Sequence, residues 1–147
     1  MTDVTITINK KSILSDVSMS TSYLATRNEQ GNTYSRVAVL EADKELIDTY
    51  YNEACNHITT ALKAHIANVT NNDTTYTATL KLSSAFNGML AESINTALKT
   101  YCTHYILSRW YEITDKQRSE YYFAVAKDNL TMAQRNIVHK NAPKREI

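Results

Sequence analysis

Two short segments of the chain alternate strictly between apolar and polar residues. Residues 2–8 place valine and isoleucine between polar residues, mostly threonine, and residues 76–82 repeat this alternation. A period of two, rich in β-branched residues, predicts a strand that buries one face. We therefore expect two short β-strands. Two strands are marginal as an isolated sheet, so they either pair on the helices or take strands from another copy.

Most of the remaining chain places apolar residues at spacings of three and four, which predicts amphipathic helices. The expected helices run over residues 10–27, 43–69, 85–111 and 115–137. Asn9 and the pair Ser83 and Ser84 can cap two of them, and Thr114 with Gln117 matches a capping box for the last. The Asn-rich residues 68–73 are expected to end the second helix in a turn.

These elements predict a mainly α fold, a bundle of about four helices, two of them long, with two short β-strands. The length of 147 residues suits one domain. We assign residues 1–138 to a single helical-bundle domain and residues 139–147 to a basic C-terminal tail. No apolar run is long enough for a membrane span, and the N-terminus lacks a signal-peptide pattern, so we expect a cytosolic protein without membrane contact.

The composition argues against several classes of enzyme. Only two glycines and one proline occur, which leaves no material for a glycine-rich phosphate loop or a dinucleotide-binding turn. No Gly-x-Ser-x-Gly motif supports nucleophilic catalysis. We therefore expect neither an enzyme nor a bound cofactor.

Two Cys-x-His pairs suggest a metal site, because Cys55 and His57 share one predicted helix and Cys102 and His104 share another. Residues two apart point to opposite sides of a helix, so neither pair can grip one ion as residues spaced by three or four can. Both cysteines lie on apolar stripes, which favours free, buried thiols. A metal-binding bundle remains the alternative if all four residues converge.

Opposite charges gather at two separated places in the sequence. Acidic residues surround the start of the second helix, and basic residues gather at the end of the chain. The acidic set is Glu41, Asp43, Glu45, Asp48 and Glu53, and the basic set is Arg135, Lys140, Lys144 and Arg145. Such charges favour a head-to-tail contact between copies, which makes a ring when it closes on itself. The alternative is a solvated helix start that follows the helix dipole.

Aromatic residues supply a further interface candidate. The chain has ten tyrosines against two phenylalanines, and tyrosine is favoured at protein interfaces as well as in cores. Trp110 closes the third predicted helix. We expect it to anchor the corner between the last two helices, and its alternative role is a contact with a partner.

The helical segments carry a resemblance to a known group of proteins. The stretch DKELIDTYYNEACN at residues 43–56, LSSAFN at 82–87, LAESINTALK at 90–99 and YILSRWYEIT at 105–114 resemble proteins from the structural gene blocks of Bacteroidetes tailed phages. They also resemble helical head-tail connector or head-completion adaptors. The resemblance covers residues 41–114, and the threonine-faced strands depart from the purely helical adaptor pattern.

The resemblance implies a structural virion protein that is assembled in the host cytoplasm. Its subunits would form a ring between portal and tail, through which DNA passes, with portal and tail proteins as partners and non-specific contact with the packaged DNA. The strands leave a tail-completion or tail-terminator role open. A small metal-binding or DNA-binding helical protein is the alternative of another class.

Overall fold

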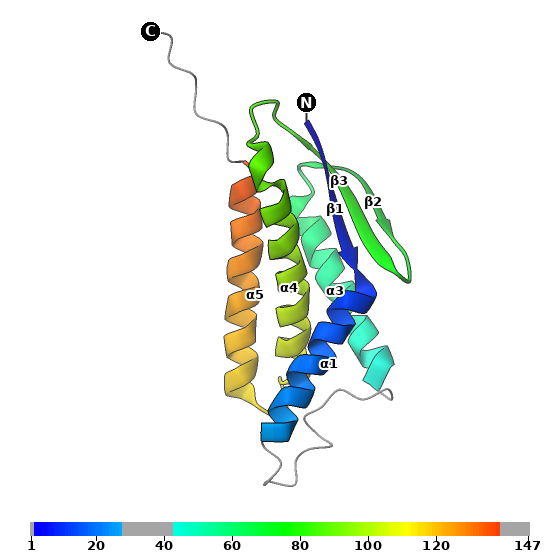
Figure 1. The fold of residues 1–147 in the computed structure, drawn as a ribbon, viewed down its shortest axis with the longest axis vertical. Coiled ribbons are helices and arrows are strands. Elements are labelled where there is room, and N and C mark those ends of the chain that lie inside the picture. Colours follow the sequence, from blue (N-terminus) through cyan, green and yellow to red (C-terminus); the bar gives the residue numbers. More distant parts are fainter. Residues whose placement is uncertain (1, 28–42, 139–147) are drawn as a thin grey trace.

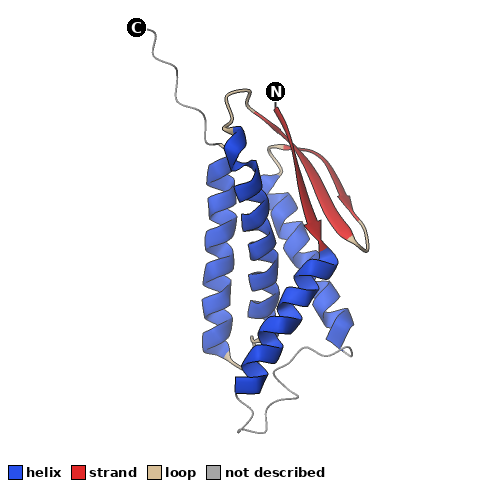
Figure 2. Ribbon diagram, in the orientation of Figure 1, coloured by secondary structure: helices blue, strands red, loops and turns tan. Residues whose placement is uncertain are grey.

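The computed structural model describes residues 2–27 and 43–138. Four α-helices and three strands follow one another in this part of the chain (Figures 1 and 2). In chain order they are β1 (Thr2–Asn9), α1 (Lys10–Arg27), α3 (Lys44–Leu62), β2 (Ile66–Asn71), β3 (Thr75–Leu82), the short 3-10 helix η3 (Gly88–Leu90), α4 (Ala91–Trp110) and α5 (Lys116–Ile137). The mainly α fold is confirmed, whereas the expected number of strands is wrong.

The N-terminal strand and helix follow the prediction closely. Val4, Ile6 and Ile8 are buried along β1, while the residues between them are exposed. At the end of the strand the Asn9 side chain accepts a hydrogen bond of 3.1 Å from the Ser12 amide. This bond caps the first turn of α1, because the first amides of a helix have no partner within it.

The second helix is shorter than the sequence pattern predicts. It ends at Leu62, and residues 66–71 form the strand β2 instead of continuing the helix. A bulge between Ile66 and Asn68 adds one residue to the strand, so Ile66 and Val69 both pack against the core although they lie three residues apart. The same spacing fits a helical stripe, which is why the pattern misled the prediction.

The strands form one antiparallel sheet with the order β1-β3-β2. β3 pairs with β1 from Thr75 opposite Asn9 to Leu82 opposite Thr2, and with β2 on its other side. The two expected strands thus pair with each other, as one of the open alternatives required. The chain reverses between β2 and β3 at Asn72, whose side chain accepts hydrogen bonds from the amides of Thr74 and Thr75, both at 2.9 Å.

Both later helices begin at different residues from those expected. The Ser83 side chain accepts a hydrogen bond from the Ala85 amide in a turn. Phe86 is buried in the segment between this turn and the next helix. Asn87 then caps η3, and α4 follows from Ala91. Asp115, not Thr114, caps α5 through a bond of 3.1 Å from the Arg118 amide.

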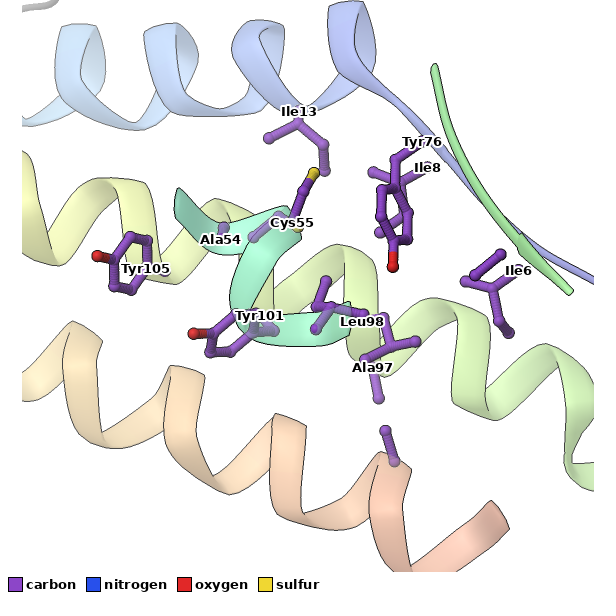
Figure 3. Packing of buried hydrophobic residues seen from close by; sticks show 14 of the residues in the cluster. Ile6, Ile8, Ile13, Ala54, Cys55, Tyr76, Ala97, Leu98, Tyr101 and Tyr105 are labelled. Carbon is purple, nitrogen blue, oxygen red and sulfur yellow. The ribbon is translucent and has the colours of Figure 1, made fainter. Parts of the chain in front are cut away.

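The core lies between one face of the sheet and the helices. α4 is the central helix and contacts α1, α3, α5 and β1, while α5 lies on the side of α4 away from the sheet (Figure 1). Figure 3 shows Ile8 and Tyr76 of the sheet close to Cys55 of α3 and Leu98 of α4. These four residues are at most 1% exposed, so the sheet is held by apolar burial against the helices.

Candidate functional site

The acidic set at the start of α3 does not form one free surface. Asp43 stands at the N-cap position without a capping side-chain bond, and Glu45 is exposed in the first turn. Asp48 pairs with Lys10 at 3.2 Å, and Glu53 lies 3.6 Å from the Arg109 guanidinium. Asp48 and Glu53 therefore have cationic partners within the chain, which the sequence did not reveal. Glu41 lies outside the described residues.

The basic partner set is represented in the structure by Arg135 alone. Arg135 is exposed in the last turn of α5, and none of the ion pairs within the described residues involves it. The end of α5 and the start of α3 lie toward opposite ends of the long axis (Figure 1). Lys140, Lys144 and Arg145 fall outside the part of the chain that the structure describes.

Arg109 is the centre of a polar cluster that the sequence did not predict. Its guanidinium contacts Glu53 of α3, pairs with Glu112 at 3.3 Å, and lies 4.9 Å from the Tyr50 ring centre. Burial alone would lower the Arg109 pKa, but Glu53, Tyr105 and Glu112 raise it above its ordinary value. Arg109 thus joins the middle of α3 to the end of α4 as a permanent cation.

Tyr105 extends this cluster into the core. Its hydroxyl donates a hydrogen bond of 2.7 Å to Glu53, and its ring stacks against Tyr101 with centres 5.9 Å apart. Burial and the Glu53 carboxylate raise the pKa of Tyr105 to about 12. The neutral hydroxyl therefore remains a hydrogen-bond donor at ordinary pH.

His57 covers the same two tyrosines from α3. Its Nδ1 lies 2.8 Å from the Tyr101 hydroxyl, and its ring meets the Tyr105 ring edge-on at 5.0 Å. Burial first, and then the neighbouring Tyr105, raise the pKa of Tyr101. The Tyr101 hydroxyl is thus a hydrogen-bond partner that orients the His57 ring. A catalytic histidine needs such a partner too, so this contact alone does not identify a catalytic role.

An open cleft of about 550 Å³ borders this cluster on the side of α5. His57, Tyr105 and Arg109 form one wall, and Glu120 and Phe123 of α5 form another. The cleft mixes both signs of charge with one exposed aromatic ring. Such a lining suits a protein surface better than a charged small-molecule substrate.

The structure does not bring the two Cys-x-His pairs together. Cys55 of α3 and Cys102 of α4 are buried free cysteines, and the neighbouring Cys55 together with burial raises the pKa of the Cys102 thiol. His57 instead contacts Tyr101, and His104 packs on the Tyr122 ring at 5.6 Å. Among the described residues, no group of three or more metal-ligating side chains is placed to hold an ion.

Two neighbouring aromatic residues, Trp110 and Tyr111, pack at the corner between α4 and α5. Trp110 is half-buried against the core, whereas Tyr111 is 1% exposed. The Tyr111 ring stacks on Tyr122 at 5.9 Å, and the Arg118 guanidinium lies 5.6 Å from it. The role of Trp110 as an anchor of this corner stays a prediction, and the structure adds Tyr111 as a second aromatic residue packed there.

α5 leaves large side chains exposed on more than one of its sides, since Tyr121 and Phe123, two residues apart, point in opposite directions. Tyr121 is 64% exposed and Phe123 is 53% exposed, and Met132 projects from the second half of the helix. Ile113 is exposed in the turn that leads to α5. Exposed aromatic residues of this size are typical of surfaces that meet another protein.

The comparisons with known proteins add no family to this picture. No family model matches the chain, and neither the curated proteins nor the solved structures give a match. The helices of the described ranges are all too short or too polar to cross a lipid bilayer. The surfaces described above are therefore the basis for a functional interpretation.

Proposed function

We propose that the chain is a structural virion subunit of a tailed phage. In this proposal it is a head-tail connector or adaptor that forms a ring between portal and tail. The observation that carries the proposal is that α5 exposes two large aromatic side chains, Tyr121 and Phe123, on opposite sides of the helix. The resemblance over residues 41–114 names the class of assembly, and the surface supplies a physical reason to assemble.

A ring subunit needs two different surfaces, since each copy contacts two neighbours through unlike faces. α5 offers one such surface on the side of α4 away from the sheet (Figure 2). The opposite charges of Glu45 at the start of α3 and Arg135 at the end of α5 favour one polarity of contact over the reverse. These features support assembly. The number of subunits in the ring is set by the rotation between neighbouring subunits.

The alternative within the same class is a tail-completion or tail-terminator protein. Both roles use a ring, and they differ in the neighbour to which the ring binds. The identity of that neighbour therefore separates them, with portal protein on one side and tail-tube protein on the other.

Mass measurement of the purified chain tests this proposal, first alone and then with candidate portal and tail proteins. We expect a ring or a defined complex at physiological salt. Phe123→Asp should keep the helical circular dichroism spectrum and remain monomeric, because a charge replaces an apolar contact. Ala124→Asp is the matched control, since it adds the same charge at the next exposed position of α5.

Two results would contradict the proposal. One is a wild-type chain that stays monomeric both alone and with every portal and tail protein tried. The other is a Phe123→Asp variant that assembles as well as Ala124→Asp. Steep, salt-dependent binding to duplex DNA by a monomer would instead favour the alternative of a DNA-binding protein.

A further inference from the structure

The two outer strands of the sheet differ in what covers their edges. An outer strand presents a row of backbone N–H and C=O groups that a further strand can pair with. On β1 the Thr7 amide donates a hydrogen bond of 3.0 Å to the Asn95 side chain of α4. No hydrogen bond within the described residues reaches the outer edge of β2.

The register identifies the backbone groups that face outward on β2. Along an antiparallel ladder, successive residues direct their backbone groups to opposite sides. The Lys10 amide donates a hydrogen bond to the Thr74 carbonyl next to the β1–β3 ladder. The backbone groups of the even-numbered residues of β3 therefore point to β1, and those of the odd-numbered residues point to β2. Thr70 is opposite Thr77, so its backbone groups point to β3. The backbone groups of Val69 and Asn71, on either side of Thr70, therefore point outward.

The same rule accounts for the protected edge. The backbone groups of Ile6 and Ile8 point to β3, so the Thr7 amide between them points away from β3. There it donates its hydrogen bond to the Asn95 side chain. β1 also carries the charged Asp3, and charged side chains discourage pairing at an edge. The β1 edge is thus closed to a new strand at its centre.

β2 lacks such protection along most of its length. Its sequence IANVTN has no charged residue and no proline, and its only irregularity is the bulge at its start. Ile66 and Val69 pack against the core, so the strand is held in an extended conformation before any partner arrives. A preformed, neutral edge needs little further ordering to accept a strand.

We propose that β2 pairs with β2 of a second copy, in antiparallel orientation about a two-fold axis. The second copy supplies a strand of the same length and the same neutral character, so no like charges oppose each other. Pairing of β2 with a neighbour's β1 is disfavoured, because Asn95 already occupies the Thr7 amide. The joined sheet has six strands and stops growing, since a closed β1 edge lies at each end.

This contact is smaller than a stable interface. One strand edge buries much less than the roughly 1,600 Å² of a standard complex, so we expect a weak dimer that forms with rising concentration. The inference uses a surface separate from α5 and does not depend on the proposed function.

Sedimentation velocity from about 10 μM to about 1 mM tests the pairing. Wild type should shift from monomer to dimer, and Thr70→Lys should raise the dissociation constant about tenfold or more by placing a charge beside the edge. Thr5→Lys is the matched control, because it makes the same substitution at an exposed threonine of β1. Asn71→Pro is a second variant, which removes an outward amide without removing a bond to β3.

Amide hydrogen exchange gives an independent measurement on the wild-type chain. Val69 and Asn71 should exchange more slowly as the dimer forms, while Thr7 should not change with concentration. A chain that remains monomeric across the range overturns the inference. So does an equal loss of dimer in Thr5→Lys, or a dimer that only Phe123→Asp abolishes, which would assign the contact to α5.

Discussion

Buried hydroxyl groups, more than ion pairs, define the polar interior of this protein at the scale of single residues. Tyr51, Tyr76 and Tyr101 are buried with pKa values raised first of all by burial. Tyr105 and Tyr111 have pKa values raised to about 12 by burial and by neighbouring groups. Each of these groups is neutral in the folded chain at a pH where an exposed tyrosine begins to ionise.

This difference predicts a loss of stability in alkali. A tyrosine whose pKa is raised on folding stabilises the native state fully below its unfolded pKa of about 10. The stabilisation is lost as the pH rises from there through the folded value, which for Tyr105 is about 12. We expect the free energy of unfolding in urea to fall over that interval. Tyr105→Phe should make the fall smaller, and Tyr121→Phe, at an exposed position, should leave it unchanged.

An unfolding free energy that stays constant over this pH range would contradict the interpretation of the buried hydroxyls. Tyrosinate absorbance measured along the same titration gives the control. The tyrosines of the core should ionise together with unfolding.

At the scale of elements, the hairpin of β2 and β3 depends on one side chain. Asn72 accepts hydrogen bonds from two backbone amides and from the Thr74 hydroxyl at 2.8 Å. Asn72→Ala should lower the free energy of unfolding by about 1 to 2 kcal/mol, because two turn amides lose their acceptor. Asn72→Asp keeps the acceptor oxygen and should be close to wild type in urea denaturation. Equal loss in both variants would show that the turn does not depend on this acceptor.

The same hairpin marks the limit of prediction from the sequence. Strand β1 and its junction with α1 follow from local signals, namely the alternation before Ile8 and the Asn9 cap. β2 does not, because its bulge gives Ile66 and Val69 a helical spacing, and only pairing with β3 decides between helix and strand. The Arg109 cluster was missed for a related reason. Glu53 and Arg109 are far apart in sequence, and only the packing of α3 on α4 makes them partners.

Whole-molecule organisation assigns different surfaces to different tasks. The sheet side offers the neutral β2 edge, and α5, which lies on the other side of α4 (Figure 1), offers exposed aromatic residues. The buried Cys55 and Cys102 and the hydrogen bond from the Tyr105 hydroxyl to Glu53 lie in the interior, where α3 packs on α4. A subunit built in this way can lose one surface contact without losing its core, so assembly and folding can be measured separately.

Truncation after Val138 tests whether the basic C-terminal residues contribute to assembly without contributing to folding. It removes Lys140, Lys144 and Arg145 and leaves Ile137, the last buried residue of α5, in place. We expect an unchanged melting temperature, because all the core residues that the structure describes are kept, and weaker assembly by mass measurement at physiological salt. Glu45→Gln at the start of α3 should weaken assembly in the same direction, and high salt should diminish the effect of both changes.

The control keeps the length of the chain and removes only its charge. Replacing the three basic residues with glutamine should weaken assembly as much as truncation does if their attraction to the acidic end acts between copies. If the truncated chain assembles as efficiently as the full one, the C-terminal charges do not contribute. The exposed aromatic residues of α5, Phe123 among them, would then be sufficient to explain the contact between subunits.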